Sequence, residues 1–210
     1  MKKLYDTYNI IKSDIIERIA DFKLVWRTGD ENRIFQELTF CLLTPQSKAE
    51  NAWKTILILT ENQKLYKGNS AEIAEDLNLV RFRNNKARYI VKAREMYFNN
   101  HNVVKKILTA ETSAFEKRIW LSKNILGYGL KESSHFLRNI GFVEDITILD
   151  RHILKNLKKY SVINEIPKSI SEKKYYEIED KMKEFSEQKN IPLEYLDLIF
   201  WYNEAKTIFK

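Results

Sequence analysis

The chain places one lysine and one aspartate at the starts of two neighbouring helical segments. Lys131 follows a Gly127-Tyr128-Gly129 turn, and Asp150 stands immediately before Arg151, at the head of the next helical pattern. An uncharged amine can attack an electrophilic carbon and form a Schiff base, and the positive end of a helix favours the uncharged form. A nearby carboxylate stabilises a transition state that carries positive charge. The pair therefore predicts covalent catalysis at a carbon that becomes cationic during the reaction.

Residues 121–138 have the pattern of two helices joined by a glycine turn. An apolar helix end runs into Gly127 and Gly129, and a second amphipathic helix follows. Glycine allows positive φ and close approach to a ligand, because it lacks Cβ. The amides of the turn and the following helix N-terminus then form a site for one phosphate oxygen. We expect a helix-hairpin-helix that binds the DNA backbone, although the glycines alone could simply join two packed helices.

Further segments combine with this lysine and aspartate to give a resemblance to a known family. The segments are residues 35–46, 81–83, 87–90, 126–131, 148–152 and 196–202. In these segments the chain resembles the helix-hairpin-helix DNA glycosylase superfamily. Within it, the chain is most similar to the second class of 8-oxoguanine DNA glycosylase/lyase, of archaea and thermophilic bacteria. Bifunctional members of the superfamily carry a lysine and an aspartate at the separation of Lys131 and Asp150. The resemblance extends from about Phe35 to the end of the chain.

The resemblance implies base excision from DNA followed by strand cleavage. Lys131 would attack C1′ of the damaged nucleotide, and the resulting Schiff base would allow β-elimination on the 3′ side. Asp150 would stabilise the oxocarbenium-like charge. It is also a reasonable N-cap for the helix that follows, and the two roles are compatible. A plain phosphate contact is the alternative for Lys131.

The expected lesion is 8-oxoguanine, but the lysine and the aspartate do not encode the choice of base. The same chemistry on another lesion, such as uracil or an oxidised pyrimidine, is therefore an alternative. A helix-hairpin-helix protein that binds DNA without catalysis is a second alternative. The catalytic pair distinguishes an enzyme from such a binding protein, whereas the pocket that receives the base decides the lesion.

A damaged base must leave the helical stack before its C1′ can be attacked, and aromatic faces receive it. The resemblance places the base between Phe82 and Trp201, and it folds the C-terminal tail, which ends at Lys210, into the same pocket. Ordinary core packing is an equal alternative for Trp201. Fraying is the usual behaviour of a terminal segment such as this tail.

Two polar residues are expected on the DNA-facing side. Thr44-Pro45 predicts an N-cap followed by proline at the first helical position, so one helix ends near Leu43 and another begins at once. Gln46 would lie in the first turn of that helix, where it resembles the polar wedge that family members insert into the gap left by the base. We expect His152 to face a DNA phosphate. A solvated glutamine and a surface histidine are the alternatives.

The apolar residues recur with a helical period almost throughout, and sustained strand alternation is absent. We therefore expect an all-α protein. The resemblance implies a two-lobed helix-hairpin-helix glycosylase fold with the active site in the cleft between the lobes. One lobe would comprise residues 36–118. Residues 1–35 and 119–210 would form the other lobe, which carries the hairpin at about 119–140 and the catalytic aspartate.

The composition agrees with a DNA partner. The chain has 210 residues, with 36 Lys and Arg against 29 Asp and Glu, for a net charge of +7. This charge suits a polyanion, and we expect double-stranded DNA that contains a damaged base. No apolar stretch approaches the length that spans a membrane. We expect a monomer that is soluble and cytoplasmic, associated with the nucleoid if the source is a prokaryote.

Cysteine and histidine usage argues against metal cofactors. Many relatives of endonuclease III hold an iron–sulfur cluster with four cysteines, but Cys41 is the only cysteine here. Its apolar neighbours predict a buried core residue. His101, His135 and His152 lack the paired spacing of zinc ligands. We expect no metal and no cofactor.

Overall fold

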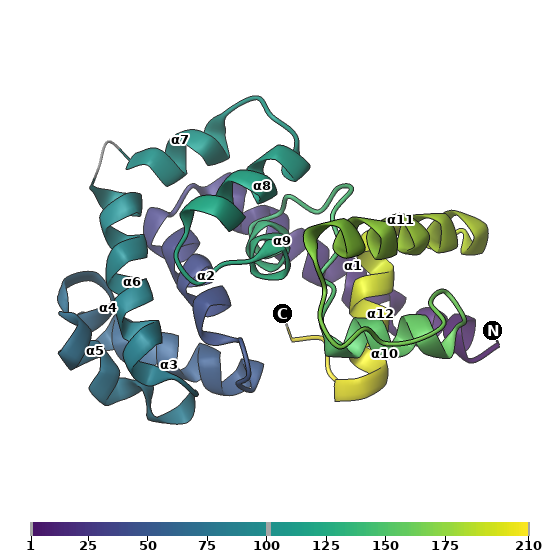
Figure 1. Cartoon of the computed structure of the whole chain (residues 1–210), viewed down its shortest axis with the longest axis horizontal. Coiled ribbons are helices and arrows are strands. Elements are labelled where there is room, and N and C mark those ends of the chain that lie inside the picture. The colour runs from purple at the N-terminus through teal and green to yellow at the C-terminus, as the bar shows by residue number, and fades with distance from the viewer. Residues whose placement is uncertain (1, 100–101, 210) are drawn as a thin grey trace.

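The computed structural model describes residues 2–99 and 102–209, and over these residues the chain forms helices and connecting turns without a β-strand (Figure 1). The predicted all-α class is confirmed. The elements are α1 (Lys2–Thr28), α2 (Glu31–Leu43), α3 (Ala49–Glu61), α4 (Lys64–Lys67), α5 (Ser70–Asp76), a 3-10 turn η1 (Leu77–Leu79), α6 (Arg83–Phe98), α7 (Val103–Thr109), α8 (Ala114–Asn124), α9 (Leu130–Asn139), α10 (Arg151–Lys159), α11 (Glu172–Lys189) and α12 (Leu193–Ala205).

Local capping fixes where several of these helices begin. The Asp30 side chain accepts hydrogen bonds from two backbone amides in the first turn of α2. Capping boxes start α5, through Asn69 and Glu72, and α8, through Ser113 and Glu116. Each cap satisfies amides that the helix itself leaves without partners. These helix starts therefore follow from short stretches of sequence.

The apolar side chains gather in two clusters. One cluster contains side chains from all the helices from α2 through α9. The other contains side chains from α10, α11 and α12 and from the first two-thirds of α1. The hairpin helices α8 and α9 thus contribute apolar side chains, among them Leu121, Phe136 and Leu137, to the cluster of α2. The lobes expected from the resemblance place residues 119–140 in the other half. Helix α9 contacts both groups of helices, since Asn139 donates to Glu37 on α2 and Arg138 donates to Asp197 on α12. The expected lobe boundary therefore stays a prediction.

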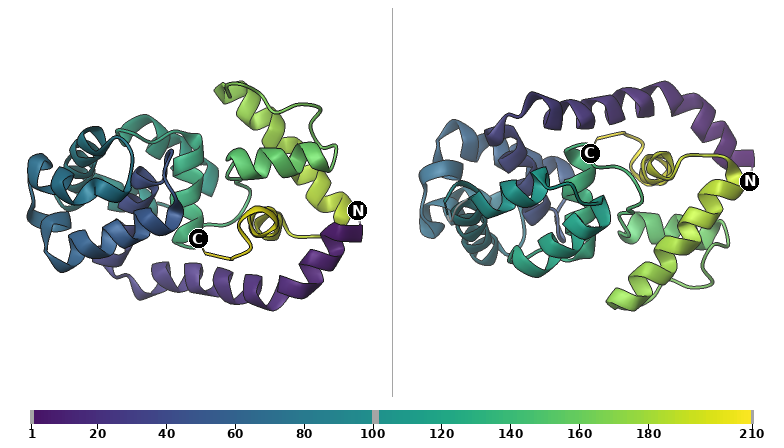
Figure 2. Two further views of the ribbon diagram at one scale, coloured as in Figure 1. Left: turned by 90° about the horizontal axis from the view of Figure 1, so that it is seen from below. Right: turned by 90° about the horizontal axis from the view of Figure 1, so that it is seen from above.

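Two segments bridge the clusters. Helix α1 runs along the length of the molecule beside both groups of helices (Figure 2). Its Ile11 and Ile15 pack in the second cluster, whereas Trp26 packs against the first. The tail after α12 turns back between the groups, so that Ile208 packs against the second cluster and Phe209 against the first (Figure 1). The lobes are therefore joined at both ends of the chain.

The turn between α2 and α3 corrects one prediction. Helix α2 ends at Leu43 as expected, but the next helix begins at Ala49 rather than at Pro45. The reason is a buried lysine from α6. Lys86 donates to the carbonyl oxygens of Leu43 and Pro45, at 2.7 and 2.9 Å, and to the Ser47 hydroxyl at 3.1 Å. These contacts hold residues 44–48 as a turn, because they satisfy carbonyls at the C-terminus of α2.

Replacing Lys86 with methionine is expected to destabilise the protein by about 1–3 kcal/mol, because buried carbonyl oxygens would lose their donor. The measurement is the free energy of unfolding in urea. Lys92→Met is the matched control, since Lys92 lies on the same helix and pairs only with Glu95 at the surface. Equal stability of the two variants would contradict the structural role of Lys86.

Candidate active site

A cavity of about 870 Å³ lies where the two groups of helices meet. Its walls come from the turn between α2 and α3, the start of α9, the start of α10 and the last part of α12. Five of the predicted site residues line it, namely Gln46, Lys131, Asp150, His152 and Trp201. Residues that are far apart in the sequence therefore meet in one place.

The hairpin turn that precedes Lys131 requires glycine at its first position. Gly127 has φ of +92°, and a Cβ added there would lie 2.5 Å from the ring of Tyr89. The Tyr128 hydroxyl donates to the carbonyl oxygen of Leu38 at 2.7 Å, which anchors the turn to α2. A side chain at position 127 would meet both backbone strain and a steric clash. The turn is thereby fixed against the first cluster.

The backbone amide of Gly129 is not open to a phosphate, although the sequence predicted that it would be. Its φ is −115°, so it does not use the left-handed region, and its amide donates to Oε2 of Glu132 at 3.2 Å. The other carboxylate oxygen, Oε1, lies 3.8 Å from Nζ of Lys131. The Glu132 carboxylate therefore already accepts the hydrogen bond that the Gly129 amide could donate to a phosphate. A DNA phosphate at this amide would have to replace it.

Lys131 lies in the first turn of α9, and its side chain is 23% exposed. Helix α9 is buried along most of its remaining length, through Ser133 to Asn139. The amine thus stands at the accessible end of a helix that is otherwise enclosed. This arrangement gives a bound molecule access to Nζ while the backbone of the helix is held rigidly.

Asp150 is the N-cap of α10. Its Oδ1 accepts hydrogen bonds from the amides of His152 and Ile153, both at 2.8 Å. The predicted capping role is confirmed. Both hydrogen bonds use the same oxygen, so the cap fixes the carboxylate and leaves Oδ2 outside it. A carboxylate held in this way is preorganised to stabilise positive charge in the cavity.

Trp201 and His152 form one wall of the cavity. Their rings meet edge to face, with 4.8 Å between centroids and 88° between planes. Trp201 is half-buried on α12, which places it between the two expected alternatives of core packing and an open stacking face. The histidine ring contacts the tryptophan, whereas the sequence predicted a phosphate contact or, as the alternative, a surface histidine.

Phe82 lies outside this cavity. It is the N-cap residue of α6, with φ of +60°, and it is 56% exposed. Its neighbour Arg81 lines the cavity instead, and the Arg81 amide donates to the Ser47 hydroxyl at 3.0 Å. Trp201 lines the cavity and Phe82 does not. Lys210 lies outside the described residues, which end at Phe209.

Several residues near the site were not predicted, and three of them carry titratable side chains on α9 or α12. Glu132 and His135 line the cavity, and Asp197 lies buried on α12, where its Oδ2 is 2.9 Å from Nη1 of Arg138. Helical spacing could have indicated two of them. His135 follows Lys131 by one turn of α9, and Asp197 precedes Trp201 by one turn of α12. Residues at such spacing share a helix face.

Asp197 belongs to the electrostatic environment of the site. Burial raises the pKa of its carboxyl from 3.8 to about 6. The Arg138 guanidinium acts in the opposite direction and lowers that pKa, as does Lys131, whereas the negative charge of Asp150 raises it. The charges of Lys131, Asp150 and Asp197 are therefore coupled.

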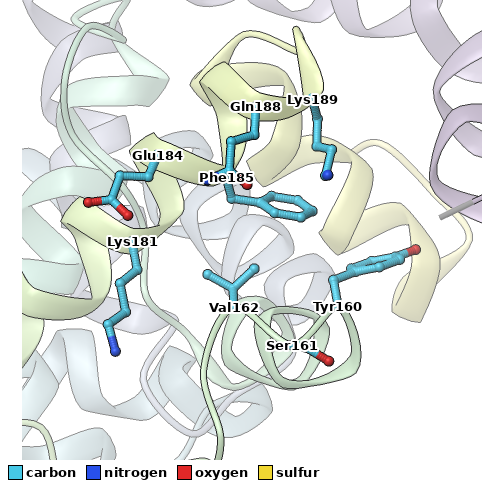
Figure 3. A pocket seen from close by; sticks show the side chains of 8 residues that line it. All are labelled: Tyr160, Ser161, Val162, Lys181, Glu184, Phe185, Gln188 and Lys189. Carbon is cyan, nitrogen blue, oxygen red and sulfur yellow. The ribbon is translucent and has the colours of Figure 1, made fainter.

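A second, smaller pocket of about 330 Å³ lies between the turn after α10 and the last part of α11 (Figure 3). The rings of Tyr160 and Phe185 stack across it at 6.1 Å, and Lys181 and Glu184 stand at its other end. It contains none of the predicted site residues. Within residues 2–99 and 102–209 we find no cluster of three or more possible metal ligands, and no helix there could span a membrane.

Comparison with known proteins identifies the family. A family model described as 8-oxoguanine DNA glycosylase matches residues 15–191. The chain belongs to this family. A relative from Fusobacterium nucleatum, named 8-oxoguanine DNA glycosylase/AP lyase, is 47% identical over 97% of this chain and 94% of the relative. A relative of the same name from Methanocaldococcus jannaschii is 38% identical over 100% and 99% of the two chains.

Solved structures of the family share the whole architecture. The glycosylase/lyase of Methanocaldococcus jannaschii, in complex with a 15mer DNA containing 8-oxoguanine, has a TM-score of 0.88 at 36% identity and covers 100% of this chain and 98% of its own. The Thermotoga maritima 8-oxoguanine DNA glycosylase has a TM-score of 0.87 at 32% identity, covering 100% and 97%. The helix-hairpin-helix glycosylase fold implied by the resemblance is confirmed.

The raised pKa of Asp197 predicts a pH-dependent contribution to the stability of this glycosylase-family protein. Between pH 3.8 and about 6 the folded protein binds a proton at Asp197 that the unfolded chain does not bind. Protonation of the Asp197 carboxyl therefore increases the free energy of unfolding as the pH falls below about 6. This contribution is lost as the pH rises through about 6. Asp197→Asn lacks this effect. Thermal unfolding from about pH 7 to about pH 4.5 should show the wild type gaining stability relative to the variant. A difference that does not change with pH would contradict the assignment.

Proposed function

We propose that the protein excises 8-oxoguanine from double-stranded DNA and cuts the strand at the resulting base-free site. The observation that carries this proposal is that Lys131 and Asp150 line the same cavity. The names of relatives that are 36–47% identical over nearly the whole chain support the choice of lesion. The same chemistry on another lesion is the second candidate, because the pair itself does not read the base.

Lys131 supplies the nucleophile in this proposal. Its uncharged amine attacks C1′ of the deoxyribose, and the electron pair of the C1′–N bond leaves with the base. The amine then loses a proton, the sugar ring opens, and a Schiff base joins Nζ to C1′. Loss of a proton from C2′ breaks the C3′–O bond and cuts the strand by β-elimination. Asp150 stabilises the positive charge that develops on the sugar while the base departs.

The walls of the cavity supply contacts for a base that has left the duplex. Trp201 offers an aromatic face, and such stacking contributes about 1–3 kcal/mol per base. Gln46 stands on the turn at the cavity mouth, with φ of +54°, from where it would enter the gap in the duplex.

Phe82 would form the second stacking face only after its exposed side chain swings toward the cavity. The proposed contact of Lys210 with the lesion rests on the resemblance, and the inward course of Ile208 and Phe209 supports it.

Backbone contacts hold the DNA in this proposal. The hairpin around Gly127 and Gly129 would bind one phosphate after displacement of Glu132, and His152 would contact another from its place beside Trp201. The net charge of +7 adds attraction that does not depend on sequence. All residues assigned to the reaction come from one chain, which supports a monomer. A DNA substrate also supports the cytoplasmic location expected from the sequence, with nucleoid association if the source is a prokaryote.

Lys131→Gln is expected to abolish covalent trapping on lesion DNA by borohydride, because the variant lacks the amine that forms the Schiff base. Gel separation of trapped complexes measures the result for a duplex with one 8-oxoguanine. Lys92→Gln is the control and is expected to trap like the wild type, since Lys92 is exposed on α6. Trapping of the Lys131 variant at the wild-type level would assign the nucleophile to another amine.

Asp150→Asn separates the capping role from the catalytic one. Asparagine caps helices about as well as aspartate, so the melting temperature should stay close to that of the wild type. Base excision is expected to fall by roughly a hundredfold or more, because the variant cannot stabilise positive charge on the sugar. Single-turnover release of 8-oxoguanine measures the effect. A near-normal rate with an unchanged melting temperature would reduce Asp150 to a helix cap.

A further inference from the structure

A buried cluster of polar side chains links the hairpin to the segment that leads into Asp150. We call it the clamp, and its members come from four parts of the chain. They are Arg118 on α8, Ser134 on α9, Thr147 in the segment before Asp150, and Tyr175 and Glu179 on α11. All five side chains belong to buried residues, and none of them lines the cavity.

An ion pair forms the centre of the clamp. The Arg118 guanidinium makes two hydrogen bonds to the Glu179 carboxylate, with Nη1 at 2.6 Å from Oε1 and Nη2 at 2.8 Å from Oε2. Nη1 also lies 3.4 Å from the hydroxyl oxygen of Ser134. One arginine thus connects the two helices of the hairpin to α11. Lys131 stands three residues before this serine on α9.

The other half of the clamp holds the backbone before Asp150. Oε1 of Glu179 accepts hydrogen bonds from the amide and the hydroxyl of Thr147, at 2.8 and 3.0 Å. The Tyr175 hydroxyl donates to the carbonyl oxygen of Thr147 at 2.7 Å and accepts from the amide of Leu149 at 3.3 Å. Burial raises the pKa of the tyrosine, so the hydroxyl keeps the proton that it donates. Three backbone groups just before Asp150 are thereby fixed.

Stability alone does not explain such a cluster. A buried ion pair loses the hydration of both charges, and apolar residues of similar size often stabilise a protein equally well or better. Directional hydrogen bonds to a backbone segment do something that apolar packing does not, because they define its position and orientation. The contacts at Thr147 and Leu149 lie just before Asp150, whose carboxylate must face the reacting sugar.

We propose that the clamp positions Asp150 relative to Lys131, and that Tyr175 is the positioning residue which acts most directly on Asp150. This inference rests on the proposed function of the Lys131 and Asp150 pair. The clamp fixes α9 at Ser134 and the Asp150 segment at Thr147, each three residues away from the group that it positions. Arg118 and Glu179 join these two contacts. The separation of amine and carboxylate therefore depends on the clamp.

The two steps of the reaction should depend on the clamp unequally. Departure of the base puts positive charge on the sugar, and this step needs the carboxylate of Asp150 in place. Cutting at a site that has already lost its base begins from an aldehyde, and it needs Lys131 more than Asp150. Loss of the Tyr175 hydroxyl should therefore slow excision more strongly than it slows cutting of a base-free site.

The test compares Tyr175→Phe with Tyr176→Phe. Both variants lose one hydroxyl from neighbouring positions of α11 and keep a ring that faces Arg118, but the Tyr176 hydroxyl donates to Glu172 at the surface. Tyr175→Phe is expected to lower single-turnover excision by about ten- to a hundredfold, the range that follows from a small misplacement of a reacting group. Cutting of a preformed base-free site should fall by less than about threefold, and amide exchange at residues 149–153 should become faster. Tyr176→Phe should match the wild type in all three measurements.

Thr147→Val is a second variant, which keeps the shape of the side chain and removes only the hydroxyl bond to Glu179. This variant is also expected to slow excision more than it slows cutting of a base-free site, but by a smaller factor than Tyr175→Phe. Wild-type excision in Tyr175→Phe, or an equal fall in excision and cutting, would overturn the inference while the proposed function stands. A wild-type protein that releases no 8-oxoguanine would overturn the proposed function instead, and the inference would fall with it.

Discussion

The arrangement of the site depends on one constraint, which is the pairing of polar side chains buried along α9. Ser134 faces Arg118 on α8, Arg138 pairs with Asp197 on α12, and Asn139 donates to Glu37 on α2 at 3.0 Å. A buried polar group without a partner costs about 1–3 kcal/mol. These partners lie on three different helices, so α9 satisfies all of them in only one position. Lys131, in its first turn, is placed by the same contacts.

The contacts that order α9 also connect it to walls of the cavity. Helix α12 offers Asp197 to Arg138 and, one turn later, Trp201 to the cavity. The segment held by Glu179 leads to Asp150 and α10. The contacts of α9 with Arg118 and with Asp197 therefore each help to order a second functional residue, Asp150 in one case and Trp201 in the other. Rigid placement of amine, carboxylate and aromatic face is what a reaction through a short-lived cationic state requires.

The sequence predicted the features that depend on residues close together in the chain. It did not predict the features that depend on contacts between residues far apart in the chain. The all-α class, the hairpin and the capping role of Asp150 follow from local patterns. The start of α3 was predicted wrongly, because Lys86 reaches back to Pro45 from α6. The pairing of Arg118 with Glu179 spans 61 positions, and no spacing rule connects them. The exposed place of Phe82, too, follows from the left-handed backbone at the start of α6, which the residue types do not indicate.

The central claim is that the amine held at the start of α9 attacks the sugar. The most direct test is to trap the wild-type protein on 8-oxoguanine DNA with borohydride, digest the complex, and locate the modified residue by mass spectrometry. The account predicts a single adduct on Lys131. An adduct on the N-terminal amine or on another lysine, with Lys131 unmodified, would contradict it.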